Sequence, residues 1–343
     1  MDIKDIKEKY DSVSIVGLAK NAGKTVTLNY VIEKSFTEGI KLGITTTGRD
    51  GEKNDLVTNT EKPTIYVTEG VLVATSSQAL LISDAKTEIL ATTGIKSPMG
   101  EIIIVRVRRA GDIQIAGPVS AANIKKVVRL LQSFGAELVL VDGAIDRKAA
   151  SSPAITDACI MSSGAVLGRD MKTVVERTAF AVACYKLKQT KKDIEDILSS
   201  KICIVDEIET EKSVDDVKYN VVEIAALTGI TAGDKLTEKI SEKTKYVYVG
   251  GAITPLLLKK LMKNKYIKNY ELIIDDGTKI FIEPNLWNEA RKKGLTISVR
   301  DNIKLIALSL NPVSPEGYYF DSDEFIDGIK KYITDVEVLD VCK

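Results

Sequence analysis

Short apolar segments rich in Val and Ile alternate along the chain with amphipathic stretches. The apolar segments predict strands that are buried on both faces, as in a parallel sheet. The stretches between them have apolar positions at helical spacing, which favours crossover helices and an α/β fold. The expected strands are 12–17, 101–107, 137–143, 201–206, 245–251 and 271–277, and the expected helices are 24–37, 120–134, 170–188, 232–242, 253–264, 284–293 and 322–333.

Capping residues mark the ends of several expected helices. Ser120 can accept a hydrogen bond from the first turn of one helix, and Gly135 can end it in a left-handed conformation. Thr254 can cap another helix whose first position is Pro255. These signals fix the helix ends more firmly than periodicity alone.

The chain is long enough for two domains, and a change in composition suggests where they divide. Residues 60–119 are rich in Thr, Ser, Val and Ile, and we interpret them as extra strands, partly antiparallel, inserted into the first domain. Residues 189–219 are heavily charged, which places the expected boundary near residue 200. The expected domains are therefore a nucleotide-binding domain at 1–200 and a smaller α/β domain at 201–343.

Composition excludes several classes of function. The 343 residues carry 48 basic and 48 acidic side chains, whereas proteins that coat nucleic acid usually have a basic excess. There is no histidine, which rules out Ser-His-Asp catalysis, zinc sites with histidine ligands and a histidine on cobalt. The four cysteines lack metal-site spacing, the N-terminus is too charged for a signal peptide, and no apolar run is long enough to span a membrane. A cytoplasmic location is expected.

The strongest chemical signal is the sequence SIVGLAKNAGKTV at 14–26, where a strand is followed by a loop and a helix. Backbone N–H groups of such a loop surround phosphates, the Lys24 ammonium contacts the β- and γ-phosphates, and the Thr25 hydroxyl binds Mg²⁺. The alternative is a purely structural turn. The residues expected to bind nucleotide here are Gly17, Ala19, Lys20, Asn21, Ala22, Gly23, Lys24, Thr25 and Val26.

The loop has an unusual spacing, with five residues between Gly17 and Gly23 where the common P-loop has four. The same spacing is found in dethiobiotin synthetase-like proteins, and the Lys-Asn-x-Gly-Lys-Thr core resembles adaptors of molybdopterin-guanine dinucleotide biosynthesis. Both belong to the branch of P-loop proteins that includes MinD-type ATPases. In this branch an extra loop lysine can contact phosphate, sometimes across a dimer interface. Lys20 is therefore either a phosphate ligand, with a homodimer as a candidate assembly, or a solvated surface lysine.

Two acids near strand ends are candidates for the magnesium and water sites. Asp142 ends the apolar segment LVLVD, where an acid facing a P-loop commonly holds Mg²⁺, although Asp-Gly is also an ordinary turn. Arg147 follows closely and either contacts phosphate or pairs with Asp146. In the loop 45–55, directly after the second apolar strand (LGI), Asp50 is the preferred group for orienting water or metal, with Glu52 and Asp55 behind it. The alternative for that loop is a charged surface hairpin.

A late asparagine is a candidate for reading the base. Asn311 follows the apolar run LIALSL and precedes a proline. Its amide could bond adenine, or Asn-Pro could simply form a turn. The chain lacks an Asn-Lys-x-Asp guanine-reading sequence, so ATP is favoured over GTP.

Taken together, SIVGLAKNAGKT, GITTTGRDGE, LVLVDGAIDR and SLNPVSPEGY resemble the P-loop subunit of the lysine 5,6-aminomutase reactivase. The resemblance covers most of the chain and implies a P-loop NTPase-like, mostly parallel sheet flanked by helices. It also implies an ATP- and Mg²⁺-dependent, chaperone-like factor in lysine fermentation. Such a factor acts with a second, mismatch-repair-like subunit and releases damaged cobalamin from the aminomutase.

Two other functions remain open. The loop spacing is compatible with a dethiobiotin synthetase-like enzyme that uses ATP to phosphorylate a small acid. A nucleotide-binding scaffold that does not hydrolyse ATP is the third possibility. For an ATPase, we expect Lys24, Asp50 and Glu52 to carry the catalytic roles.

Overall fold

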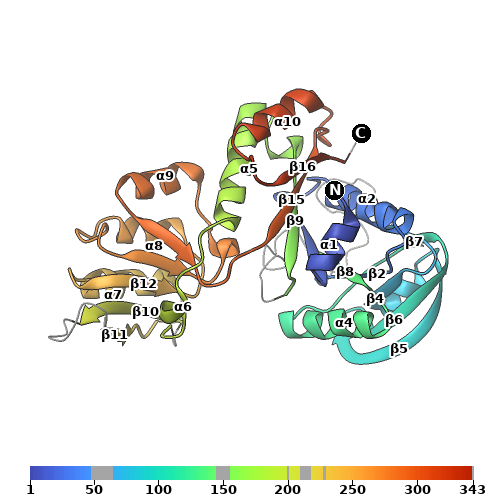
Figure 1. Ribbon diagram of the computed structural model, residues 1–343, viewed down its shortest axis with the longest axis horizontal. Coiled ribbons are helices and arrows are strands. Elements are labelled where there is room, and N and C mark those ends of the chain that lie inside the picture. Colours follow the sequence, from blue (N-terminus) through green and yellow to red (C-terminus); the bar gives the residue numbers. More distant parts are fainter. Residues whose placement is uncertain (48–64, 144–154, 199–200, 209–217, 227–228, 342–343) are drawn as a thin grey trace. The chain divides into compact units, whose positions relative to one another are not determined.

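The computed structural model divides the chain into two compact units, which are described separately (Figure 1). The first unit comprises Met1–Ala181 together with Ile303–Lys343, and the second comprises Val182–Asn302. The boundary between them falls inside one helix, α5 (Met171–Tyr185). The structure describes residues 1–47, 65–143, 155–198, 201–208, 218–226 and 229–341.

This division corrects the expected one, which joined all of 201–343 into a second domain. The run LIALSL forms β15 (Leu305–Asn311), which pairs in parallel with β9 (Ala158–Gly164) of the first unit. A further strand, β16 (Glu337–Asp340), pairs in parallel with β15. A strand buried on both faces needs neighbours in a sheet, and β15 finds them beside β9 rather than in the segment that precedes it.

In the described part of the chain, the first unit contains a nine-stranded sheet with the order β16-β15-β9-β1-β8-β2-β4-β6-β5. The neighbours from β16 to β4 are all parallel, which bears out an α/β architecture with a large, mostly parallel sheet. The remaining strands of this sheet are β1 (Ser12–Gly17), β2 (Leu42–Thr46), β4 (Leu72–Ser76), β5 (Lys86–Ser97), β6 (Gly100–Arg109) and β8 (Leu138–Asp142).

The segment 60–119 supplies the antiparallel strands, as expected. However, β6 runs antiparallel to both β4 and β5, so the prediction of 101–107 as a parallel strand is wrong. The reason is the short connection from β5 to β6, which can only close a hairpin. Nearby, β3 (Ile65–Val67) and β7 (Gly111–Ile113) form a small antiparallel sheet.

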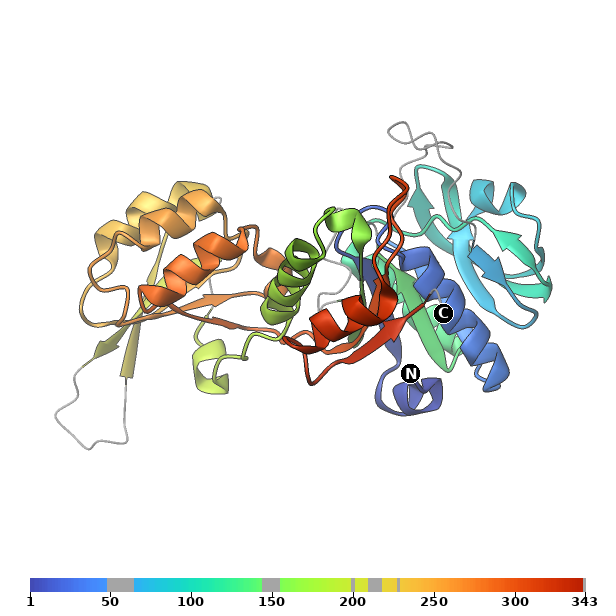
Figure 2. The same ribbon diagram turned by 90° about the horizontal axis from the view of Figure 1, so that it is seen from above.

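Helices cover both faces of the large sheet. On one face, Leu28 and Val31 of α2 (Lys24–Thr37) share a core with Leu138 and Leu140 of β8. On the other face, α4 (Ala121–Ser133) packs against the alternate residues of β8, which include Val139. The period of two along β8 therefore builds one core on each face. The remaining helices of this unit are α1 (Ile3–Lys9), α3 (Ser77–Leu81) and α10 (Ser322–Lys330), and α10 lies beside α5 (Figures 1 and 2).

The second unit contains a five-stranded sheet in its described part, with the order β11-β10-β12-β13-β14. Strands β12 to β14 are parallel, but β10 is antiparallel to both of its neighbours. The prediction of a parallel strand at 201–206 is therefore wrong in its direction. An apolar run shows that both faces are buried and does not encode strand direction. The elements are α6 (Lys192–Glu195), β10 (Ile202–Ile208), β11 (Lys218–Glu223), α7 (Gly229–Lys239), β12 (Thr244–Val249), α8 (Pro255–Leu261), β13 (Glu271–Ile274), α9 (Pro284–Lys292) and β14 (Thr296–Val299).

The expected caps are confirmed. The Ser120 hydroxyl accepts a hydrogen bond from the N–H of Asn123, and Gly135 has φ 102° after the helix. Thr254 caps α8 through the N–H of Leu257, with Pro255 at the first position. Across the described residues, no helix is long and apolar enough to cross a membrane.

The pairing of β15 with β9 in the first unit predicts how shortened chains behave. A chain ending at residue 200 lacks β15 and β16, so β9 loses one of its two neighbouring strands. We expect this chain to be insoluble or to lack cooperative unfolding when followed by circular dichroism during heating. The matched control is 1–181 joined to 303–343 by a flexible linker, which should fold. Cooperative unfolding of the 1–200 chain would contradict the division described above.

Candidate functional site

The expected nucleotide-binding residues gather at the carboxyl edge of the large sheet, around β1. After β1 the chain builds strands on the β8 side, and after β8 it crosses to β9 on the other side. Such a reversal leaves a crevice outside the carboxyl ends of the central strands, where ligands bind in open α/β sheets. Gly17 pairs with Ser162, Ile15 with Asp142, and Thr46 with Asp142, so the ends of β9, β1, β8 and β2 are adjacent.

The loop after β1 leads into a helix N-terminus that is not capped by a side chain. Gly23 is the N-cap of α2, with φ 98°, and it makes no side-chain capping hydrogen bond. The first turn contains no acid; it contains Lys24 and Thr25. By contrast, Ser120 caps α4. Because the first N–H groups of a helix lack intrahelical partners, this end of α2 suits an anion.

Lys24 folds back across the start of the loop. A Cβ atom at Gly17 would lie 2.9 Å from Cγ of Lys24, so a residue with a side chain at position 17 would displace this lysine. The Lys24 ammonium donates a hydrogen bond of 2.8 Å to the carbonyl of Gly143, just beyond β8. The lysine is thus held between the loop 17–25 and the end of the strand that carries Asp142.

Asp142 provides a half-buried carboxylate at this edge. Its Oδ1 atom is buried and has no hydrogen-bond partner among the residues that the structure describes. Burial raises the pKa of the Asp142 carboxyl above its usual value, and the charge of Lys24 opposes that rise. A buried carboxylate oxygen without a donor is costly unless a cation or a proton satisfies it.

Three buried hydroxyl groups fasten the start of α2 to the sheet. The Thr27 hydroxyl lies 3.1 Å from that of Ser162 and 2.7 Å from that of Ser309, which lies 2.8 Å from Ser162. The N–H of Leu18 also bonds the carbonyl of Ser162. Sequence reasoning missed Thr27 and Ser309, because small hydroxyl residues inside apolar runs look like ordinary core positions. Their signal was that each of the two, like Ser162, falls near the end of an expected strand or helix.

The structure brings most of the expected site residues together. Ala19 accepts a turn hydrogen bond from the N–H of Ala22, Lys20 and Asn21 lie between them, and Val26 follows Thr25 in the first turn of α2. Asn311, from the end of β15, reaches the same loop. Asp50, Glu52, Asp55 and Arg147 lie outside the described residues.

These residues fit a magnesium–nucleotide complex chemically. The unpartnered Asp142 oxygen is a hard ligand of the kind that Mg²⁺ prefers, and Thr25 supplies a hydroxyl in the first turn of α2. Across the described chain, no group of three or more His, Cys, Asp or Glu side chains could hold a metal alone.

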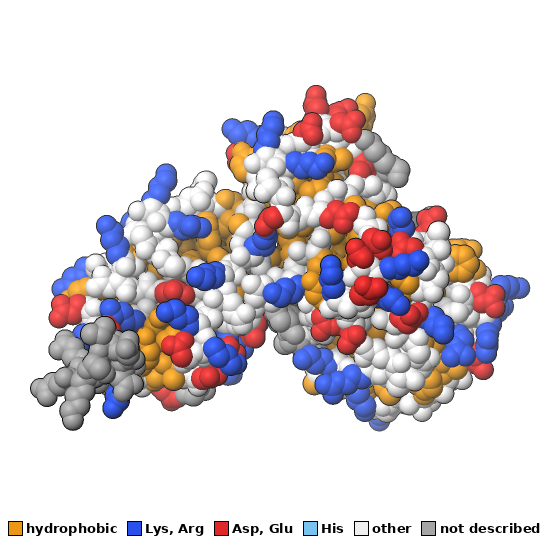
Figure 3. Space-filling model, viewed as in Figure 1, with side chains coloured by type: hydrophobic (Ala, Val, Ile, Leu, Met, Phe, Trp, Pro, Cys, Tyr) orange, Lys and Arg blue, Asp and Glu red, His pale blue; other side chains and the backbone are white. Residues whose placement is uncertain are grey.

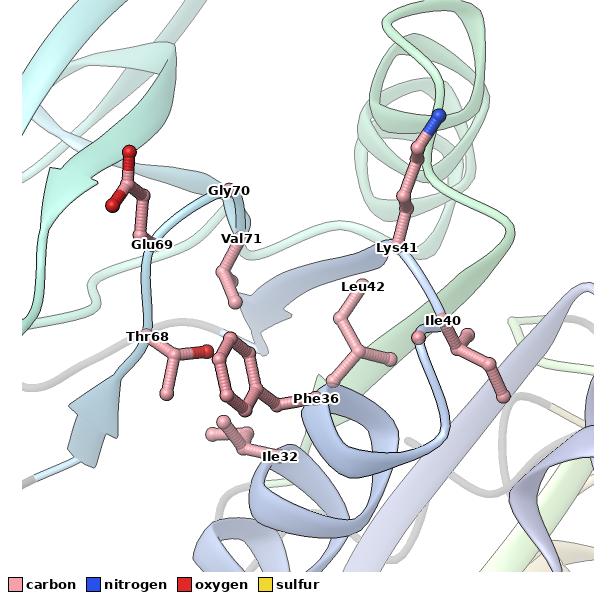
Figure 4. Close-up of a pocket in the computed structure, with 10 residues that line it drawn as sticks. Ile32, Phe36, Ile40, Lys41, Leu42, Thr68, Glu69, Gly70 and Val71 are labelled. Carbon is pink, nitrogen blue, oxygen red and sulfur yellow. The ribbon is translucent and has the colours of Figure 1, made fainter.

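Two hollows lie away from this edge. One, about 210 Å³, lies at the opposite end of α2, where Figure 4 shows Ile32 and Phe36 facing Val71 and Thr68. The other, about 440 Å³, is a shallow hollow over α4 lined partly by basic side chains, and Figure 3 shows Lys and Arg side chains gathered there. Neither includes a residue of the phosphate loop.

A polar cluster in the second unit is satisfied by its own members. The Tyr248 hydroxyl donates to Asp275 at 2.6 Å, while Arg300 donates to that hydroxyl and pairs with Asp275 at 3.2 Å. Burial and the neighbouring carboxylate raise the pKa of Tyr248 above its usual value. The cluster ties the carboxyl ends of β12, β13 and β14 together, which is a structural role.

No protein-family model, no curated protein and no solved structure matches this chain.

Proposed function

We propose that the chain binds Mg-ATP at the loop 17–25 and hydrolyses it. The observation that supports this proposal most is the juxtaposition of Lys24, the uncapped N-terminus of α2 and the buried, unpartnered oxygen of Asp142. A structural turn between a strand and a helix needs none of these three features. Their combination suits a ligand that carries both negative phosphate charge and a divalent cation.

Each residue then has a defined task. The loop N–H groups and the start of α2 hold the phosphates, and Lys24 exchanges its bond to the Gly143 carbonyl for a phosphate oxygen. Thr25 and Asp142 hold Mg²⁺, which would neutralise charge on the β- and γ-phosphates. Asp50 or Glu52 orients the attacking water in this proposal.

We also propose the biological role that the sequence resemblance implies. The protein would be the ATP-dependent subunit of a reactivating factor for lysine 5,6-aminomutase, working with a mismatch-repair-like subunit. The four motifs that carry the resemblance include three from the carboxyl edge of the large sheet: the phosphate loop, the end of β8 and the end of β15.

Phosphate release from Mg-ATP tests both levels of the proposal. The purified chain is assayed alone, with the second subunit, and with aminomutase inactivated by turnover. We expect slow release by the chain alone and a rise of at least about 10-fold with both partners, as partner-supplied groups commonly give in P-loop proteins.

The same assay separates the alternatives. A rate that ignores both partners would contradict the reactivase role, and a rate that rises only with a small carboxylate acceptor would favour the dethiobiotin synthetase-like reaction. Tight ATP binding without turnover under every condition would leave a nucleotide-binding scaffold.

A further inference from the structure

Asn311 lies at the end of β15 with both ends of its amide occupied by backbone groups. Its Oδ1 accepts a hydrogen bond from the N–H of Val313 at 3.0 Å, and its Nδ2 donates to the carbonyl of Asn21 at 3.5 Å. The contact between Nδ2 and the Asn21 carbonyl is long, so it orients the two groups more than it stabilises the protein. The Oδ1 contact is the turn that the Asn-Pro alternative predicted, and the Nδ2 contact directs the same amide at the loop 17–25 instead of leaving it free for adenine.

The loop residue that Asn311 contacts has an uncommon backbone conformation. Asn21 has φ 61° and is the only residue other than glycine with positive φ in the described chain. An L-residue pays a steric cost there, although asparagine tolerates it better than most. Because the peptide group is planar, a contact at the Asn21 carbonyl also fixes the direction of the Ala22 N–H, which bonds the carbonyl of Ala19 and closes the turn of the loop.

Asn311 also packs tightly against the glycine that begins α2. A Cβ atom at Gly23 would lie 2.9 Å from Cβ of Asn311, and one at Gly164 would lie 2.4 Å from the Asn311 carbonyl oxygen. The residue is therefore wedged between the start of α2 and the end of β9. Two positions earlier on β15, Ser309 bonds the hydroxyl of Thr27 in α2. The last segment of the chain thus supports the phosphate loop from one side.

We propose that Asn311 is a positioning residue for the phosphate loop. It holds Asn21 and Gly23 in the conformations that direct the loop N–H groups at the triphosphate, and it does not read the base. The inference rests on the proposed function, because it names how that site is kept in shape. Affinity for triphosphate should therefore depend on Asn311, and discrimination between ATP and GTP should not.

Binding of Mg-ATP, Mg-GTP and Mg-tripolyphosphate to the full chain and to Asn311→Ala tests this. The substitution keeps the Cβ packed on Gly23 and removes only the amide. We expect all three dissociation constants to rise by one common factor of about 3 to 10, as for loss of a modest hydrogen bond. Asn29→Ala is the matched control, because Asn29 also bonds a backbone N–H, that of Tyr66, on the same unit away from the loop. That variant should bind all three ligands as the wild type does.

Asn21→Gly in the Asn311→Ala background separates positioning from general destabilisation. Glycine adopts positive φ without steric cost, so the double variant should recover at least about half of the lost affinity on a logarithmic scale. Weaker ATP binding with unchanged tripolyphosphate binding would overturn the inference in favour of base reading, and so would unchanged binding of all three ligands or absence of the recovery. A wild-type chain that binds none of the three ligands would instead overturn the proposed function.

Discussion

Lys24→Ala is expected to lower the rate of ATP hydrolysis by at least about 100-fold, the usual cost of removing one positioned group that stabilises transition-state charge. The side chain is already aimed along the loop, because its stem lies where a Cβ of Gly17 would be and its ammonium bonds the Gly143 carbonyl. Lys24→Arg should fail similarly, since a broad, planar guanidinium does not replace the compact ammonium that bonds the Gly143 carbonyl. Phosphate release with both partners present is the measurement.

Lys34→Ala is the matched control for this variant. Lys34 lies in the last turn of the same helix, so the substitution changes the net charge equally at the end away from the loop. We expect its hydrolysis rate to remain within about twofold of the wild type, as for most surface substitutions. If Lys24→Ala retained full activity with both partners, the loop would not be the phosphate site and the proposed function would be lost.

The parts of the fold that sequence could predict are those determined by local chemistry. The helix start at Ser120, its end at Gly135 and the Thr254–Pro255 cap all depend on residues within a few positions of one another. The sequence did not predict the directions of β6 and β10, because an apolar run has the same pattern in a parallel and in an antiparallel strand. The pairing of β15 with β9 in the first unit was also not predicted. It depends on contacts between segments that are far apart in the sequence.

In the candidate site, too, the sequence predicted what depends on neighbouring residues and did not predict contacts between distant ones. Gly23, Lys24 and Thr25 follow one another in sequence, and their spacing from β1 indicates their chemistry directly. The contact of Asn311 with the loop joins residues separated by 290 positions, and no pattern in the sequence shows it. The hydroxyl groups of Thr27, Ser162 and Ser309 are recognisable only once α2, β9 and β15 are in place. Sequence reasoning therefore named the loop residues and Asn311 as candidates, but it did not show that Asn311, Thr27 and Ser309 hold the loop and the start of α2.

Asp142→Asn is expected to stabilise the protein without ligand and to abolish its magnesium-dependent activity. Asparagine has nearly the same shape and removes a buried charge whose Oδ1 has no partner in the described chain. The gain comes from removing the desolvation penalty on the charge, which the attraction of Lys24 partly offsets, so we expect a rise of a few degrees in the midpoint of unfolding near neutral pH. Hydrolysis of Mg-ATP should fall by at least about 100-fold, because Mg²⁺ loses its carboxylate ligand.

The raised pKa of Asp142 also predicts how the stability of the wild-type protein changes with pH. Because burial raises the pKa of Asp142 in the folded state, the folded protein binds more protons than the unfolded chain between the unfolded-state pKa of about 3.9 and the raised folded-state pKa. Wild-type stability should therefore fall as the pH rises through that window and stay lower above it, and Asp142→Asn should lack this fall. Thermal unfolding of the wild type and of Asp142→Asn, measured across pH without Mg²⁺, tests both expectations.

Asp157→Asn is the control variant. The Asp157 carboxylate accepts hydrogen bonds from the N–H groups of Asp11 and Ser12, so loss of its charge should destabilise the folded protein. A less stable Asp142→Asn protein would show that Asp142 is already satisfied without a cation, and the assignment of the magnesium ligand would fail.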